Sequence, residues 1–158
     1  LVRSLTLIDT KASADTKQGR AGRDAMADRL LDLGRTGIAD EMIKGLLGRS
    51  PSRRAQARLR SMIEGTRYET FVAALQGMKE RQDRTSLLKR IEVPTLVVAG
   101  TDDAVIPVAE MRAMAETIPG ARFNLIADAG HLPPIEQPDY VNQALIELFE
   151  GRKVVWWK

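Results

Sequence analysis

The sequence contains no cysteine and a single histidine, His131, among its 158 residues. Without cysteine, the chain has no disulfide framework, no zinc–thiolate site and no thiol nucleophile. No apolar run approaches the roughly 18 residues that a membrane-spanning helix needs, and residues 1–8 are too short for a secretory signal. These absences make a cytoplasmic location the default expectation. We assign no metal site and no cofactor.

The composition is that of an ordinary globular chain with a mild basic excess. Hydrophobic residues make up 44% and charged residues 28%, and the net charge is +3. The length fits one domain with a substantial core. Much of the positive charge falls in one run of arginines: Arg49, Arg53, Arg54, Arg58 and Arg60. A solvated helix face is the favoured interpretation, because the run lacks the interleaved aromatic residues typical of nucleic-acid binding; an anion-binding surface is the alternative.

Three short segments predict strands: Leu5–Ile8, residues 94–99 and residues 121–127. The first two are short apolar runs followed by polar turn residues, as buried parallel strands are. Helical patterns follow the second and third runs, beginning near Pro107 and Pro138. This strand–helix–strand–helix order predicts an α/β fold whose parallel sheet has right-handed crossovers.

The segment between the first two strands has a helical pattern. We expect a loop over residues 11–22 and then five helical segments up to residue 90. Gly34 is expected to end the first helix, and Thr36 to cap the second. Ser52 is expected to cap the third, and Thr66 to open the fourth with a capping box. The predicted organisation is residues 1–10 and 91–150 as the sheet part, residues 11–90 as a helical insertion and residues 151–158 as a tail.

Two residues with possible chemistry follow neighbouring strands. Asp103 comes just after the second strand and His131 just after the third. The carboxyl ends of parallel strands meet at one edge of a sheet, which is where open α/β folds keep their sites. A carboxylate that orients an imidazole makes up two thirds of a hydrolytic triad.

The residues around this pair resemble a known family. The run V-P-T-L-V-V-A-G-T-D-D-A-V-I-P and the later A-G-H-L-P-P-I-E-Q-P are similar to the carboxyl-terminal part of an α/β-hydrolase. The resemblance is to the enol-lactonase and haloperoxidase-like esterase branch. The opening V-R-S-L-T-L-I-D-T resembles the family's sixth strand, which leads into a helical cap. The similarity covers about residues 1–150.

The resemblance implies that Asp103 is the triad acid and His131 the general base. Asp103 is preferred over Asp102 because the family's acid occupies the fourth position of a Gly-x-x-Asp turn, which begins here at Gly100. A serine hydroxyl is a poor nucleophile until an imidazole takes its proton, and a buried carboxylate holds that imidazole in the right tautomer.

The family's nucleophile is not evident in this sequence. It lies in a G-x-S-x-G turn between a strand and a helix, and no serine here has that setting. The serines are Ser4, Ser13, Ser50, Ser52, Ser61 and Ser86. The family's first five strands are also missing from the pattern. The strand Leu5–Ile8 would therefore present an open sheet edge, which a second chain or copy is expected to cover.

Four hypotheses follow. The chain is a hydrolase of small esters or lactones that is completed by a partner, a longer native chain or a rearranged oligomer. In the second hypothesis, the chain is a slow enzyme in which His131 and Asp103 activate water directly. In the third, the chain is a non-catalytic relic that binds a partner through its sheet edge. In the fourth, it is an anion binder that uses the arginine run. The first hypothesis is favoured, with nucleophile and substrate-binding residues unassigned and with neither membrane nor nucleic acid expected as a partner.

Overall fold

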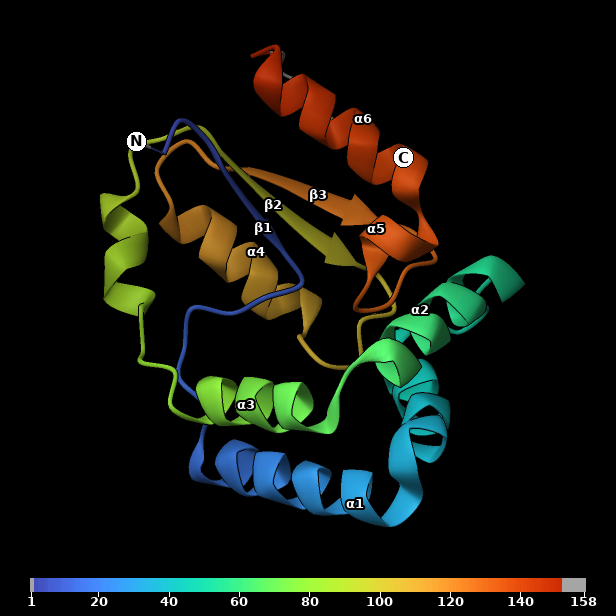
Figure 1. The fold of residues 1–158 in the computed structure, drawn as a ribbon. Coiled ribbons are helices and arrows are strands. Elements are labelled where there is room, and N and C mark those ends of the chain that lie inside the picture. Colours follow the sequence, from blue (N-terminus) through green and yellow to red (C-terminus); the bar gives the residue numbers. More distant parts are fainter. Residues whose placement is uncertain (1, 152–158) are drawn as a thin grey trace.

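The computed structural model describes residues 2–151, so the predicted tail lies outside the described residues apart from Gly151. Its centre is a parallel sheet with the strand order β1-β2-β3 (Figure 1). The strands are β1 (Leu5–Ile8), β2 (Thr95–Gly100) and β3 (Arg122–Ile126). The prediction of three parallel strands is therefore confirmed.

The central strand β2 is buried at every position, which its unbroken apolar sequence T-L-V-V-A-G explains. Its side chains alternate between two apolar clusters, as the two-residue period of a strand requires. Val97 and Ala99 join the cluster beneath α4 (Val108–Thr117), whereas Leu96 and Val98 join the cluster beneath α6 (Pro138–Phe149).

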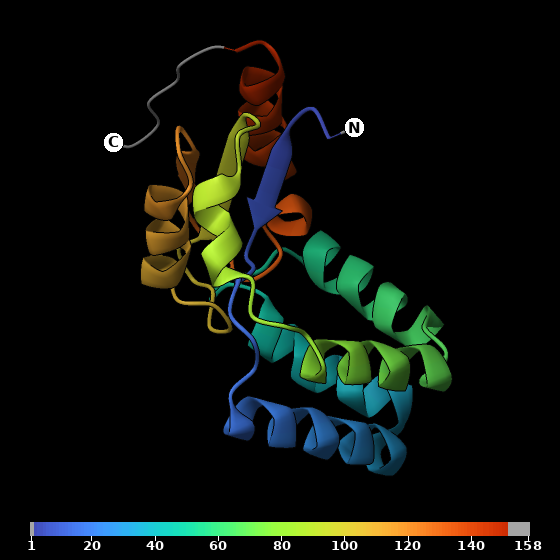
Figure 2. The same ribbon diagram turned by 90° about the vertical axis from the view of Figure 1, so that its left-hand side faces the viewer.

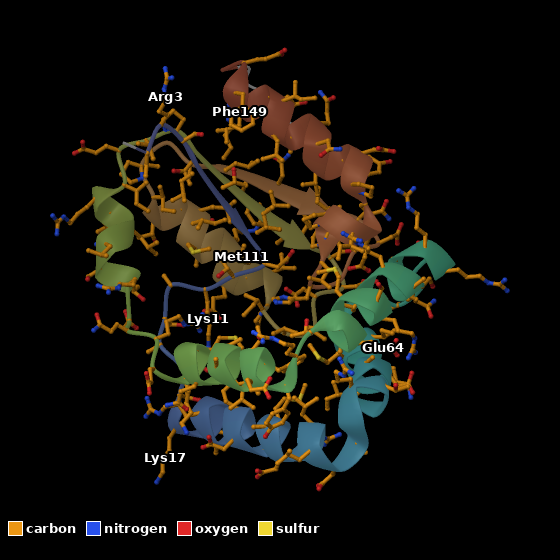
Figure 3. All side chains as sticks on the ribbon, viewed as in Figure 1. Arg3, Lys11, Lys17, Glu64, Met111 and Phe149 are labelled. Carbon is orange, nitrogen blue, oxygen red and sulfur yellow. The ribbon has the colours of Figure 1, made fainter. Side chains whose placement is uncertain are left out.

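The two faces of the sheet are covered by different helices (Figure 2). On one face, Met111 of α4 is fully buried against the sheet (Figure 3), with Leu88 of the short 3₁₀ helix η1 (Thr85–Arg90) in the same cluster. On the other face, Val141, Ala144 and Leu148 of α6 pack on β2 and β3. The short helix α5 (Pro133–Glu136) leads into α6.

Three helices form a separate layer beyond the carboxyl ends of the strands (Figures 1 and 2). They are α1 (Lys17–Leu46), α2 (Arg53–Gly65) and α3 (Tyr68–Lys79). They have their own apolar cluster: Leu30, Ile38, Ala39, Leu47, Ala55, Leu59 and Ile63. Leu132, just before α5, and Ile135, within α5, pack against this cluster and so connect the helical layer to the sheet layer.

One predicted helix end was wrong, and another was correct. The first helix begins at Lys17, inside the expected loop, because the side chain of Thr16 accepts a hydrogen bond from the backbone of Gly19 and caps it. Gly34, with a positive φ of 63°, ends the first helical stretch as predicted: two helices meet there at a kink, and α1 denotes both, from Lys17 to Leu46. Glycine tolerates this conformation without the steric cost of a side chain.

The predicted capping box at Thr66 was also wrong. The cap position of α3 is Arg67, which makes no side-chain cap hydrogen bond. The hydroxyl of Thr66 instead donates to the carbonyl of Met62 in the preceding helix. The prediction that Ser52 caps α2 was correct, since its hydroxyl accepts a hydrogen bond from the backbone N–H of Ala55. Among residues 2–151, no helix combines the length and apolar character needed to cross a membrane.

Candidate active site

Asp103 is held rigidly in the turn that follows β2. Its carboxyl oxygen Oδ1 accepts hydrogen bonds from the backbone N–H groups of Val105 at 2.7 Å and Ile106 at 3.1 Å. Its side chain is fully buried. Two backbone donors on one oxygen leave Oδ2 available to a partner, and they fix the direction in which that oxygen points.

His131 supplies that partner. Its Nδ1 lies 2.9 Å from Oδ2 of Asp103, across 28 positions of sequence. Its side chain remains 23% exposed, and its backbone N–H donates to the carbonyl of Leu46 at 2.7 Å. When Nδ1–H donates to a carboxylate, the other ring nitrogen Nε2 keeps a lone pair that can accept a proton. The arrangement can therefore carry out general base chemistry.

Two glycines allow the histidine loop to pass between β2 and the end of α1. A Cβ atom on Gly130 would lie 2.5 Å from the backbone nitrogen of Gly48 and 2.5 Å from the backbone carbon of Leu47. A Cβ atom on Gly100 would collide with the backbone oxygens of Ala129 and Gly130. No rotamer change relieves contacts with backbone atoms, so both positions require glycine.

Glu136 connects the histidine loop to the helical layer. Its Oε2 accepts a hydrogen bond from Gly48 at 2.7 Å, and its Oε1 accepts from Gly130 at 2.9 Å and from Leu132 at 3.4 Å. Sequence analysis gave Glu136 no role, although it lies inside the motif that ends at Pro138. The signal in the sequence was the position of this carboxylate two residues before Pro138, the proline that begins α6.

Asp102, the acid next to Asp103, faces the helical layer instead of His131. Its Oδ2 accepts the backbone N–H of Arg49 at 3.1 Å, and its Oδ1 pairs with the guanidinium of Arg49 at 3.0 Å. The two neighbouring acids thus have separate partners. One contacts the imidazole, and the other fixes the segment between α1 and α2.

Asp9 is a third acid at this edge of the sheet. It follows β1, is only 4% exposed, and its Oδ1 accepts the backbone N–H of Gly100 at 2.9 Å. Burial, most of all, and the neighbouring Asp103 and Glu136 together raise the pKa of Asp9 to about 7, against a lowering by the Gly100 hydrogen bond. Sequence analysis treated Asp9 only as a turn residue. Its position at the end of a strand next to the acid-bearing strand was the signal.

The arginine run divides between internal partners and a surface hollow. Arg49 pairs with Asp102, and Arg60 pairs with Asp40 and Glu64. Arg54 and Arg58 instead line a cavity of about 500 Å³ together with Ser52, Pro134, Ile135, Glu136 and Pro138. Arg54 and Arg58 therefore place positive charge beside the apolar side chains of Pro134, Ile135 and Pro138 in this cavity.

The six serines do not complete a triad within residues 2–151. None of them hydrogen-bonds to His131; Ser52 caps α2, and Ser13 donates to Glu110 at 3.3 Å. Likewise, the described part of the chain holds no cluster of three histidine or acidic side chains arranged for a metal ion. The described chemistry is therefore that of an imidazole and its carboxylate.

A parallel sheet that delivers an acid and a histidine from adjacent strand ends is the arrangement of the α/β-hydrolase class. The sequence matches the family described as alpha/beta hydrolase fold over residues 2–138. The match covers most of the chain, and the chain belongs to this family. The resemblance stated from sequence is confirmed.

The solved structures and curated proteins that resemble this chain include esterases and a lactonase. A thermophilic esterase from Thermogutta terrifontis, solved with malate bound, superposes with a TM-score of 0.88 at 41% identity, covering 94% of this chain and 56% of that one. The enol-lactonase from Burkholderia xenovorans shares the fold, with a TM-score of 0.81 at 23% identity over 94% of this chain and 56% of that one. The pimeloyl-[acyl-carrier protein] methyl ester esterase of Xanthomonas campestris is 36% identical over 99 residues, which are 60% of this chain and 39% of that protein. The chain thus spans little more than half of its solved relatives and less than half of its curated ones.

Proposed function

We propose that this chain provides the base and the acid of a site that hydrolyses small carboxylic esters or lactones. The observation that carries the proposal is the 2.9 Å contact between His131 Nδ1 and Asp103 Oδ2. In this mechanism, the attacking oxygen gives its proton to Nε2 of His131 as its bond to the carbonyl carbon forms. The same proton then passes to the departing alkoxide as the ester bond breaks.

Asp103 acts through His131 and not on the substrate. Its carboxylate keeps the Nδ1–H tautomer and stabilises the imidazolium that forms during the proton transfer. Because the side chain is buried and receives two backbone hydrogen bonds, little reorganisation is needed when that charge appears.

We further propose that the nucleophile and the oxyanion-binding amides come from outside residues 2–151. None of the serines contacts His131 in the described part of the chain. Moreover, β1 pairs with β2 on one side only and meets no other described strand. A second chain, a longer native chain or a rearranged oligomer would supply both the missing groups and the cover for this edge.

The three-helix layer is proposed to act as a cap over this site, residues 11–90 forming the cap and residues 1–10 and 91–150 the sheet part. The support is the contact network between the layers: His131 N–H to Leu46, Glu136 to Gly48, and Asp102 to Arg49. These contacts make the end of α1 part of the wall beside the histidine.

A second function, a non-catalytic interaction module, has one observation in its favour. The backbone N–H groups of Leu5 and Asp9 bond to the β2 side, so the alternate residue Thr6 presents its N–H to the open side of β1. An exposed edge of this kind can bind another strand. Thr6→Pro would remove the outward donor, and it should weaken self-association or partner binding in sedimentation velocity, whereas Thr6→Val should not.

The test of the hydrolase is turnover of p-nitrophenyl butyrate and of a small lactone by wild type and His131→Ala, with Tyr140→Phe on the exposed face of α6 as control. Intact-mass analysis after treatment with a fluorophosphonate would show whether a serine is activated. Turnover that needs His131, with or without an adduct, supports the proposal. Equal rates in wild type and His131→Ala would overturn it. No turnover together with a Thr6-dependent assembly would favour the interaction module.

A further inference from the structure

Asp9 is a buried acid that the proposed chemistry does not use. Its Oδ1 accepts the N–H of Gly100, and its own N–H donates to the carbonyl of Val98 at 3.0 Å. Gly100 begins the turn that carries Asp103. The carboxyl of Asp9 is therefore fixed against the residue that positions the acid of the His131 pair.

The ionisable groups that face Asp9 are acidic. Asp103 lies within hydrogen-bonding reach of it, Glu136 acts on it electrostatically from α5, and His131 contacts Asp103. Within residues 2–151, Oδ2 of Asp9 is buried and has no hydrogen-bond donor. A buried carboxylate oxygen without a donor is costly, and a second carboxylate beside it increases the cost.

Asp15 shows that burial alone does not produce this situation. It is also 4% exposed, but Lys11, Arg23 and Arg81 all pair with it. Its pKa is lowered to about 2, with the hydrogen bond from Arg23 as the largest cause. Asp9 is equally inaccessible to solvent but is more deeply enclosed by protein and has no cationic partner within residues 2–151, so its pKa moves in the opposite direction.

We propose that Asp9 is a positioning residue that carries a proton and donates it to the Asp103 carboxyl, holding that carboxyl toward His131, and that loss of this proton weakens the His131–Asp103 pair. The proposal rests on the function proposed for that pair. It resolves two features at once: Oδ2 of Asp9 becomes a donor with a partner, and the buried cluster holds one negative charge instead of two neighbouring ones.

The consequence for the pair follows from simple electrostatics. With Asp9 neutral, Asp103 receives two backbone donors, the imidazole and the Asp9 hydroxyl. With Asp9 ionised, the two carboxylates repel each other, which loosens Asp103.

Two substitutions separate positioning from a merely structural role. Asp9→Asn keeps an oxygen for the Gly100 N–H and offers a permanent N–H donor to Asp103, but it does not titrate. Asp9→Ala removes both. If Asp9 acts through its proton, the Asn variant should preserve the pair and remove its pH dependence.

The experiment uses NMR, which does not depend on turnover. Aspartate labelled with ¹³C at the carboxyl carbon would be incorporated, and a carboxyl that titrates near pH 7 should appear in wild type and be absent in Asp9→Asn. The low-field Nδ1–H proton of His131, the only histidine, reports the contact with Asp103. Its signal should weaken in wild type as the pH rises above 7, persist in Asp9→Asn through pH 8.5, and be weak at every pH in Asp9→Ala.

Aspartate carboxyls that all titrate below about pH 5 would overturn the proposal, as would an Nδ1–H signal with the same pH dependence in wild type and Asp9→Asn. Because the Asn variant is nearly isosteric, a failure of the Ala variant to fold leaves the test intact. In preparations that turn over ester, kcat/KM should fall above pH 7 in wild type, by up to about tenfold per pH unit, and not in Asp9→Asn. A positive NMR result together with equal ester turnover in wild type and His131→Ala would contradict the proposed function while supporting the role of Asp9.

Discussion

Glu136 and Gly48 lie 88 positions apart in sequence, yet the carboxylate of one accepts the backbone N–H of the other at 2.7 Å. The same carboxylate accepts the N–H of Gly130, the residue before His131. One side chain therefore ties the helical layer to the histidine loop, and the position of the base depends on how the two layers are joined.

Replacing Glu136 by glutamine should destabilise the protein. The amide keeps one acceptor oxygen but turns its NH₂ group toward one of the two backbone donors. The expected loss is about 1–3 kcal/mol in the free energy of unfolding, the cost of leaving a buried donor unpaired. Urea denaturation followed by circular dichroism measures it. The exposed Glu116→Gln on α4 is the control, and an equal stability for both variants would show that the Glu136 contacts contribute little.

Replacing glycine by alanine should change the stability of the fold in opposite directions at Gly130, in the histidine loop, and at Gly77, in α3. Gly130→Ala places a Cβ against the backbone of Leu47 and Gly48 and should cost roughly 1–3 kcal/mol or more. Gly77→Ala in α3 meets nothing within 4 Å and should stabilise by roughly 0.5–1 kcal/mol, since alanine is the better helix former. Thermal denaturation of the two variants compares them directly. A mild effect at Gly130 would indicate that the histidine loop can move away from α1.

The strands and the acid–histidine pair could be predicted from sequence because their signals are local. An unbroken apolar run defines β2, a short segment bounded by turns defines β3, and the order of elements fixes a parallel sheet. Asp103 and His131 directly follow these strands, so strand geometry brings them to one edge. Helix ends were less predictable: the first helix begins at Lys17, inside the expected loop, and the hydroxyl of Thr66, which carries the signal of a cap, bonds backward to Met62.

The contacts of Glu136 and Asp9 were beyond sequence analysis for a different reason. Each depends on backbone groups far away in the chain, Gly48 for one and Gly100 for the other. A carboxylate shows no sign in sequence of which distant N–H it will meet. Only the assembled layers bring those groups together.

Asp103→Asn should abolish most of any esterase activity while leaving the fold intact. The amide would present its N–H to Nδ1 of His131 and favour the tautomer in which Nε2 is protonated and cannot act as a base. The expected fall in kcat is on the order of 10⁴-fold, the effect of the wrong tautomer in a serine hydrolase triad. Asp139→Asn, in the exposed first turn of α6, is the matched control. A similar kcat for the two variants would remove Asp103 from the mechanism.

The raised pKa of Asp9 also predicts how stability depends on pH. An aspartate with a folded-state pKa of about 7 and an unfolded value of 3.8 favours folding fully only below pH 3.8. That contribution is lost as the pH rises toward 7, because the unfolded chain ionises first. Between pH 5 and pH 8, wild type should lose roughly 3 kcal/mol relative to Asp9→Asn, two pH units of linkage at that residue. Urea unfolding of both proteins at the two pH values tests this, and parallel curves would mean that Asp9 ionises normally in the fold.

Arg54 and Arg58 predict a preference for substrates that carry a carboxylate away from the scissile bond. Both line the cavity beside α5, together with the apolar side chains of Pro134, Ile135 and Pro138, and neither forms an ion pair with an acidic side chain within residues 2–151. Arg54→Glu should lower kcat/KM for a monoester of a dicarboxylic acid relative to the matching neutral ester, by about tenfold for a loss near 1.4 kcal/mol. Arg53→Glu, one position earlier on α2 and outside the cavity lining, should change the ratio much less. If Arg54→Glu left the ratio of the two kcat/KM values unchanged, the arginines would serve only as a solvent-exposed helix face. That is the interpretation that the composition alone favours.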